Sequence, residues 1–245
     1  MIKTLEELSL NAWPALQTKL YDGWIMRFAN GYTKRSNSIN PIYHSTLQIQ
    51  EKIGICENEY KKQNLPVVFK VTKDSHPQGI DNELERRNYF RLDETSVRVL
   101  EMSHYQYRRP EGILVDNIFS DEWFKDFVNC SGLENEMYQR TAKEILHNIL
   151  GKVVVVRKKI DDKIIGCGYG AIERGYIGIF DIIVDKNYRG KGFGQDVMDG
   201  ILSAATDEKI ENAYLSVVVG NDPAENLYQK LGFKEIYRYW YRFRF

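Results

Sequence analysis

The sequence predicts an α/β fold built on a mixed sheet, and three observations lead to this prediction. Residues 179–201 pass from an apolar, β-branched run through a glycine-rich turn into an amphipathic helix. Segments with strand and helix periodicity alternate through the rest of the C-terminal half. The N-terminal half repeats part of the same order, which suggests a second unit of a similar kind.

The elements of the C-terminal half follow from periodicity and from end signals. Ser120 is expected to cap a helix whose first turn holds Asp121 and Glu122. A second helix is expected near 134–150, with Gly151 at its C-cap. After a leading strand, the predicted order is α-α-β-β-β-α-β-α-β. Apolar or alternating runs predict the strands, at 113–115, 153–156, 164–171, 176–184, 213–219 and 237–245.

The N-terminal half contains a weaker version of this unit. Residues 81–90 (DNELERRNYF) align without gaps with residues 224–233 (AENLYQKLGF). This self-similarity suggests a duplicated domain, although chance similarity of two short helices is an equal alternative. The polar Pro/Gly stretch 108–112 is the expected boundary, which gives domains 1–110 and 111–245. Other elements expected in the first domain are a helix over 46–64 and strands over 67–72 and 96–102.

Composition excludes several classes of protein. Lys plus Arg and Asp plus Glu both number 34, so no net charge attracts nucleic acid or an anionic membrane. The 3 cysteines form no C-x-x-C pair and the 4 histidines are scattered, so neither a disulfide scaffold nor a metal site is expected. The N-terminal residues have no continuous apolar core, so no signal peptide is expected, and no apolar run approaches the length of a membrane span. We therefore expect a cytoplasmic monomer or homodimer that binds no membrane, nucleic acid or metal.

The glycine-rich turn is the strongest functional signal. The strand that ends at Val184 is followed by R-G-K-G-F-G at 189–194, which opens a helix. Such a turn presents backbone N–H groups to a phosphate at a helix N-terminus, and glycines let the backbone approach the ligand closely. No Ser or Thr follows Lys191, as a P-loop requires, and the third glycine falls one place early for a dinucleotide fingerprint.

The R-x-x-G-x-G pattern of Arg189, Gly192 and Gly194 resembles the acyl-CoA pyrophosphate loop of the GNAT superfamily of N-acetyltransferases. About thirty residues later, NDPAENLYQKLGF at 221–233 is similar to the family's next signature, an Asn after the fifth strand and a helix ending in L-Y-x-K-x-G-F. Two signatures in this order and separation are more specific than either alone. The resemblance covers roughly residues 113–245.

The resemblance implies a GNAT-like acyl-CoA N-acyltransferase fold, with a second, degenerate GNAT-like domain at the N-terminus. In that first domain, residues 33–41 lack a glycine loop and Glu85 stands in the place of Tyr228. Acetyl-CoA is the implied cosubstrate and an unidentified amine the acceptor. The implied cofactor-binding residues are Ile182, Ile183, Val184, Arg189, Gly190, Lys191, Gly192, Phe193, Gly194, Asn221, Asn226 and Tyr228.

Two residues are candidates for catalysis. Tyr228 is the candidate general acid for the departing CoA thiolate, because a phenol is protonated at neutral pH; packing on its helix is the alternative. Asp181 interrupts an apolar strand and is a candidate general base, although a structural salt bridge is as good an explanation. Glu173 or a chain of waters could also take the proton. Asn221 is expected to bind the cofactor or to bridge the separated strands, and the equal alternative is that it only forms a turn before Asp222.

The resemblance therefore implies an N-acetyltransferase that uses acetyl-CoA, with direct attack by the amine in a ternary complex. Two alternatives remain open. The protein could be a CoA-binding sensor or assembly module without catalysis, or an acyltransferase that uses a longer acyl-CoA or a hydroxyl acceptor. The acceptor could be a small amine, an antibiotic, a peptide N-terminus or a lysine side chain.

Overall fold

The computed structural model describes residues 1–206 and 208–245. The chain folds into two compact units. The first unit comprises Met1–Val97, Val217–Asn221 and Glu235–Phe245, and the second comprises Arg98–Ser216 and Asp222–Lys234. The last strand therefore belongs to the first unit, and the boundary expected at 108–112 lies inside the second. These units differ from the proposed domains 1–110 and 111–245, which remain a proposal about the origin of the two halves.

The first unit has six strands in the order β1-β2-β3-β4-β11-β5. Strand β3 pairs in parallel with β4 at Ile39 and Phe69, and helix α2 connects them, so the unit contains a β-α-β crossover. Its elements are α1 (Ile2–Ala12), β1 (Gln17–Tyr21), β2 (Trp24–Phe28), β3 (Ile39–Asn40), α2 (Ile49–Lys62), β4 (Val67–Thr72), α3 (Ile80–Arg86), the first part of β5 (Phe90–Glu101) and most of β11 (Lys234–Arg244).

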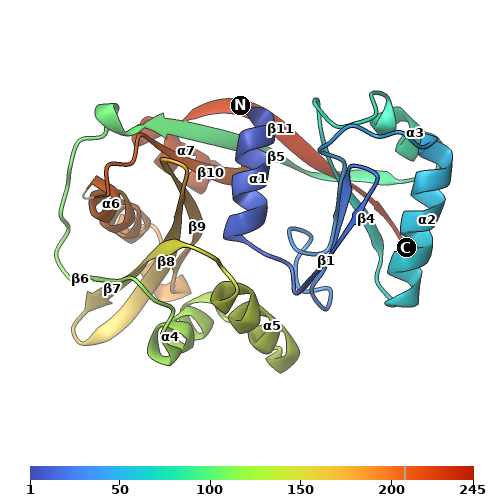
Figure 1. Ribbon diagram of the computed structural model, residues 1–245. Helices are drawn as coiled ribbons and strands as arrows, with labels where there is room; N and C mark the ends of the chain where they lie inside the picture. The colour runs from blue at the N-terminus through green and yellow to red at the C-terminus, as the bar shows by residue number, and fades with distance from the viewer. Residues whose placement is uncertain (207) are drawn as a thin grey trace. The chain divides into compact units, whose positions relative to one another are not determined.

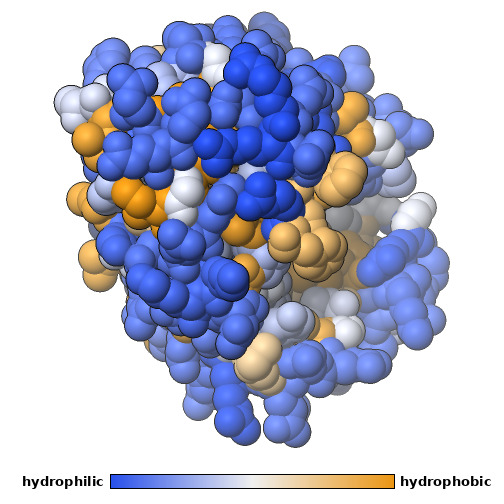
Figure 2. Space-filling view, turned by 90° about the vertical axis from the view of Figure 1, so that its right-hand side faces the viewer, coloured by the Kyte–Doolittle hydropathy of each residue, from blue (hydrophilic) through white to orange (hydrophobic). Residues whose placement is uncertain are grey.

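The core of the first unit is formed by apolar side chains of α2, α3, β2, β3 and β4. Trp24, Phe69 and Tyr89 meet edge to face there, with ring centroids 5.6 Å apart in both pairs. Helix α2 buries only Lys52, Ile53, Cys56 and Tyr60, and its exposed positions are all polar or charged. Figure 2 views the molecule from the side of α2 and α3, and the surface there is mostly hydrophilic with small hydrophobic patches.

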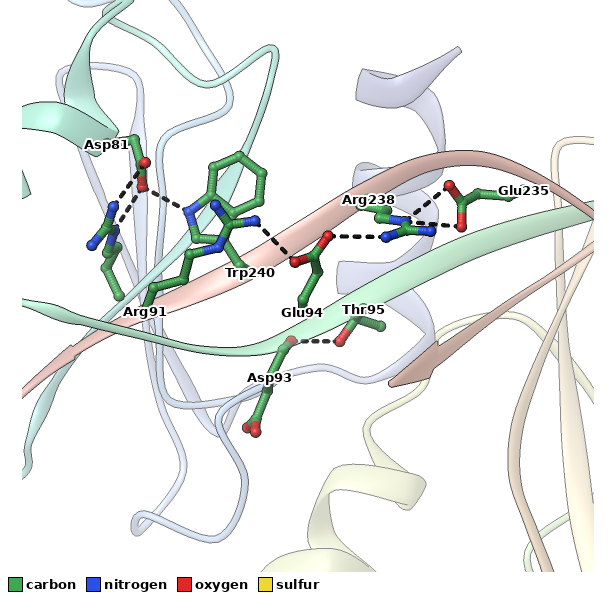
Figure 3. Close-up of polar contacts among 9 residues, drawn as sticks. Asp81, Arg91, Asp93, Glu94, Thr95, Glu235, Arg238 and Trp240 are labelled. Carbon is green, nitrogen blue, oxygen red and sulfur yellow. Dashed lines mark hydrogen bonds and ion pairs between the residues drawn. The ribbon is translucent and has the colours of Figure 1, made fainter. Parts of the chain in front are cut away.

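A polar network lies along β5 and β11 within the first unit (Figure 3). Asp81 of α3 accepts hydrogen bonds from Trp240 Nε1 and Arg242 Nε, both at 2.7 Å. The guanidinium of Arg91 stacks on the Trp240 ring, 4.2 Å from its centroid. The arginine and aromatic residues of the C-terminal tail are therefore parts of a sheet strand, as their alternation predicts.

The second unit has the strand order β10-β9-β8-β7-β6, and the end of β5 lies beside β10. Along the chain, the predicted order of helices and strands is confirmed, with β11 of the first unit as its last strand. Its elements are the end of β5, η1 (Met102–His104), β6 (Ile113–Asp116), α4 (Asp121–Ser131), α5 (Glu136–His147), β7 (Lys152–Ile160), β8 (Lys163–Glu173), β9 (Tyr176–Val184), η2 (Lys186–Tyr188), α6 (Phe193–Thr206), most of β10 (Asn212–Val218) and α7 (Asp222–Lys230).

Helices cover both faces of the part of the sheet that lies in the second unit (Figure 1). A Cβ at Gly168 of β8 would lie 3.0 Å from Val197 of α6. The next residue, Tyr169, meets the ring of Phe119, just before α4, at 5.2 Å. Because neighbouring residues of a strand point to opposite faces, α6 and the α4 region lie on different sides of the sheet. The glycine lets α6 pack closely against β8.

Local sequence signals predicted some ends of helices and strands correctly and others wrongly. Ser120 caps α4 as predicted, because its side chain accepts a hydrogen bond from the Trp123 N–H at 3.1 Å. The prediction that Gly151 is the C-cap of α5 is wrong. The helix ends earlier, and Asn148 is its C-cap. In the first unit, α3 ends at Arg86, and β5 begins at Phe90 rather than at 96.

Candidate functional site

The strands β9 and β10 separate partway along their length. Their parallel pairing runs from Tyr176 with Asn212 to Gly178 with Tyr214. On its other side β9 remains paired with β8 as far as Val184. The last part of β9 is therefore held by one neighbour and diverges from the other. Its residues 181–184 are half-buried, whereas 177–180 are buried.

A glycine loop follows directly. Gly190 and Gly192 have φ +77° and +86°, backbone angles that other residues rarely adopt. A Cβ at either position would meet nothing within 4 Å, so the space beside both glycines is open. The positive φ therefore shapes the loop, and the missing side chains leave room for a ligand.

Helix α6 begins at the end of this loop. Its first hydrogen bonds run from the N–H groups of Gln195 and Asp196 to the carbonyl of Gly192, at 3.0 and 3.3 Å. The N–H groups of Phe193 and Gly194 precede these bonds, so they stand at the positive end of the helix dipole. This arrangement can bind an anion such as a pyrophosphate.

Charged side chains hold the loop. Arg189 Nε donates to the Val184 carbonyl at 3.0 Å, which connects the loop to the end of β9. Asp185 accepts from the Asn187 N–H at 2.9 Å and pairs with Lys163 at 3.2 Å. The ammonium of Lys191 lies 5.4 Å from the centre of the Tyr188 ring. The loop is therefore cationic at its surface and fixed at its base.

The structure brings Tyr228 and Asp181 into electrostatic reach of each other. The pKa of Tyr228 is raised to about 12, mainly because the phenol is buried; the positive charge of Arg98 acts to lower this pKa and Asp181 acts to raise it. Asp181 has φ +49°, and the register of β8 with β9 shifts between Cys167 and Tyr169. This irregularity is a β-bulge, which changes the direction of a side chain where a strand leaves regular pairing.

The other predicted residues, Asn226, Asn221 and Glu173, lie on different segments of the chain. Asn226 lies on the exposed face of α7. Asn221 is exposed in the turn before α7, where its N–H donates to the Val218 carbonyl at 3.2 Å. Glu173 pairs with Tyr176 at the start of β9. At about 3.3 Å per residue, this is roughly 26 Å from the glycine-loop end of the strand.

A cavity of about 550 Å³ lies next to α6, beyond the glycine loop. Tyr105, Arg108, Gln195, Asp199 and Lys230 contribute to its lining. Asp199 is 1% exposed and accepts a hydrogen bond from the Tyr105 hydroxyl at 3.0 Å. Its Oδ2 has no hydrogen-bond partner among the described residues, and Arg108 lies 3.7 Å away. Burial raises the pKa of this carboxyl.

Asp199 was not among the residues expected at the site. One signal was available, because Asp199 interrupts the apolar face that Val197, Met198 and Ile201 give to α6. The partners Tyr105 and Arg108 lie in the segment between β5 and β6, and no local pattern connects that segment with α6. Arg98, which acts on Tyr228, also lies outside both signature segments.

The corresponding place in the first unit is filled by the chain itself. Just before α2, the N–H groups of Thr46 and Leu47 donate to the carboxylate of Asp22 at 3.0 and 2.9 Å. The hydroxyls of Ser45 and Thr46 donate to it at 2.9 and 2.7 Å, and Lys52 lies 3.1 Å away. These hydrogen bonds lower the pKa of Asp22, and the bond from the Leu47 N–H has the largest effect. An internal carboxylate thus occupies the anion position beside this helix.

Among residues 1–206 and 208–245, no cluster of three or more His, Cys, Asp or Glu side chains is arranged to hold a metal ion. In the same residues, no helix is both long and apolar enough to cross a bilayer.

Residues 1–242 match the protein family described as probable histone acetyltransferase Rv0428c C-terminal. The chain is also 27% identical over 255 residues to the Bacillus subtilis (strain 168) protein named uncharacterized N-acetyltransferase YobR. That similarity covers 99% of this chain and 98% of the B. subtilis protein. Both matches extend through the two units.

Solved structures share the fold. A GCN5-related N-acetyltransferase from Kribbella flavida superposes with a TM-score of 0.75 at 12% identity, over 99% of this chain and 95% of that one. A tandem GNAT protein from the clavulanic acid biosynthesis pathway gives 0.65 at 12% identity, over 98% of this chain and 86% of that one. The GNAT fold predicted from the sequence is confirmed.

Proposed function

This chain belongs to the family described as probable histone acetyltransferase Rv0428c C-terminal and is a GNAT-family N-acetyltransferase, and we propose that it transfers the acetyl group of acetyl-CoA directly to an amine in a ternary complex. One observation carries the proposal. Strand β9 continues beyond its pairing with β10 and leads into an open glycine loop at the start of α6.

The loop fits the pyrophosphate of an acyl-CoA. The N–H groups of Phe193 and Gly194 precede the first bonds of α6, and the open space beside Gly190 and Gly192 lets a phosphate reach the backbone. Lys191 adds positive charge at the loop surface. We assign the pyrophosphate to residues 189–194.

The diverging end of β9 would bind the pantetheine. Beyond Gly178 the edge of β9 that faces β10 is no longer used for pairing, so this edge, with the backbone of Ile182, Ile183 and Val184, is open to an extended amide chain, although the Val184 carbonyl already accepts a hydrogen bond from Arg189. A backbone N–H near Val184 would then face the thioester oxygen. Such a donor stabilises the negative charge that develops on this oxygen in the transition state.

The cavity beside α6 would accept the nucleotide of the same ligand. It includes Gln195, the residue directly after the glycine loop. Arg108 and Lys230 would offer positive charge to a phosphate, and the Oδ2 of Asp199, which faces Arg108 at 3.7 Å, would accept a hydrogen bond from a ribose hydroxyl or an amino group.

Transfer requires that one bond forms, one breaks and two protons move. The amine nitrogen attacks the thioester carbon, and the electron pair of the C–S bond leaves with the sulfur. Tyr228 would give its hydroxyl proton to this sulfur, because a pKa of about 12 keeps the phenol protonated at neutral pH. Asp181 is the candidate acceptor of the amine proton, directly or through water, whereas Glu173 lies at the other end of β9.

The first unit would hold no second acetyl-CoA. Its helix α2 is preceded by residues whose N–H groups already bind the Asp22 carboxylate. The missing glycine loop and the filled anion position together support a degenerate first unit.

Turnover by the full chain tests the function. Acetyl-CoA is offered with a polyamine, an aminoglycoside, a peptide with a free N-terminus and a lysine peptide, and thiol release is measured. We expect release that depends on one of these amines. For Tyr228→Phe, kcat should fall about 10²-fold with unchanged acetyl-CoA affinity. Tyr138→Phe on α5 is the matched control and should match the wild type.

Each result decides a part of the proposal. The transfer assignment is wrong if no acyl-CoA gives acceptor-dependent thiol release. A higher kcat/KM with butyryl- or octanoyl-CoA would overturn the choice of acetyl-CoA. A kcat within twofold of wild type for Tyr228→Phe would remove Tyr228 as the acid and leave its packing role.

A further inference from the structure

Arg98 lies near the end of β5, outside both sequence signatures, and its side chain is 13% exposed. It reaches helix α7 through two contacts with one residue. Its Nη1 donates to the Glu225 carbonyl at 3.3 Å, and its Nη2 lies 3.3 Å from Oε1 of Glu225. One guanidinium therefore binds both the main chain and the side chain of this helix position.

This contact lies one turn before Tyr228. Residues three apart on a helix share a face, so Arg98 holds α7 on the side that bears the phenol. On the other side of Tyr228, its carbonyl accepts the Phe233 N–H at 3.0 Å, and its ring meets that of Phe233 at 6.2 Å. The helix is thus fixed both before and after the tyrosine.

The charges around the phenol oppose each other. Burial is the main cause that raises the pKa of Tyr228, and the Asp181 carboxylate adds to it. The positive charge of Arg98 acts in the other direction. Asp181 therefore favours the phenol that holds its proton, whereas Arg98 favours the phenolate that remains after the proton has left.

We propose that Arg98 is the positioning residue of Tyr228, which fixes α7 against β5 and stabilises the phenolate formed when Tyr228 protonates the departing sulfur. The proposal rests on the proposed function, in which Tyr228 is the acid. The O–H bond of Tyr228 breaks, its electron pair stays on the oxygen, and the proton joins the sulfur that took the C–S electron pair. Solvent then returns a proton to the phenolate.

A double-mutant cycle tests this role. Arg98→Gln, Tyr228→Phe and the double variant are assayed with acetyl-CoA and the amine that gives the highest rate in the panel above. In the wild-type background, Arg98→Gln should lower kcat roughly tenfold and leave the KM for acetyl-CoA unchanged. In the Tyr228→Phe background it should change kcat by less than twofold. Arg98→Lys keeps the charge and should recover most of kcat.

Arg91→Gln is the matched control. Arg91 lies on the same strand, 44% exposed in its pair with Glu94 (Figure 3), and has no part in the site. The Tm of Arg91→Gln shows how much stability is lost when an arginine is removed from β5. Its kcat should equal that of the wild type. Because Arg98→Lys retains a cation, it also keeps the test valid where Arg98→Gln unfolds.

The outcomes separate the two proposals. An equal fall in kcat from Arg98→Gln in both backgrounds would show that Arg98 acts through general packing and would overturn its role. A wild-type kcat for Arg98→Gln beside a slow Tyr228→Phe would overturn the role of Arg98 and leave the proposed function standing. A wild-type kcat for Tyr228→Phe would overturn the acid assignment, and with it the role of Arg98.

Discussion

Gly192→Asp is expected to abolish acetyl-CoA binding while the protein remains folded. The space beside Gly192 is open, so an added side chain meets no protein atom within 4 Å. The carboxylate would instead enter the space assigned to the pyrophosphate and repel it. The substitution also places an aspartate at φ +86°, a left-handed conformation that costs about 1 kcal/mol.

The size of the effect follows from ligand linkage. At about 100 times its Kd, a ligand stabilises the folded state by roughly 2.7 kcal/mol. An unfolding entropy of about 2.1 cal/mol/K per residue gives about 0.5 kcal/mol/K for a chain of 245 residues. Acetyl-CoA should therefore raise the Tm of the wild type by about 5 °C, and the strain in Gly192→Asp should lower its Tm by about 2 °C.

Thermal unfolding with and without acetyl-CoA measures both effects, and Gly132→Asp is the control. Gly132 caps α4 at φ +70°, and a Cβ there also meets nothing within 4 Å. Gly132→Asp should lose stability to a similar extent but keep the full shift with acetyl-CoA. A shift of wild-type size in Gly192→Asp would refute the assignment of the pyrophosphate to this loop.

Two predictions concern the first unit. Calorimetry on the full chain should give one acetyl-CoA per chain, because Asp22 already binds the N–H groups of Thr46 and Leu47; a stoichiometry of two would contradict this. Asp22→Asn should destabilise the protein at neutral pH, and the difference should shrink as the pH falls below about 4. The pKa of Asp22 is lowered in the folded state, so its contribution is present above the unfolded pKa and is lost in acid. Urea unfolding of both proteins at pH 7 and pH 3 measures this difference, and equal differences at the two pH values would contradict the role of Asp22.

The second unit was predictable because its signals are local. Strand β9 begins and ends where its apolar, β-branched run predicts, between the Arg174-Gly175 turn and Asp185. The glycine loop and the start of α6 follow from residues next to each other in the chain. One strand of the first unit, β4, is equally well predicted, because all of its residues 67–72 are buried and mostly apolar.

The first forty residues gave no such signal. Strand β1 is exposed over most of its length, and β3 has only two residues, so neither produces a clear alternation. The sequence also could not show that β11 pairs with β4 in the first unit, because strand pairing depends on the topology of the whole chain. For the same reason Arg98 was missed, since only the fold brings the end of β5 to Glu225.

The two units together show what makes a phosphate loop in this chain. Both contain a parallel β-α-β crossover, β3-α2-β4 in the first unit and β9-α6-β10 in the second. In the first unit, a Cβ at Gly23 would lie 2.1 Å from the His44 carbonyl, so this glycine lets the chain fold onto itself. The neighbouring Asp22 then supplies the anion for the residues before α2. In the second unit, Gly190 and Gly192 face open space just before the start of α6. A glycine beside a helix start therefore indicates a ligand only where the chain itself leaves the space unfilled.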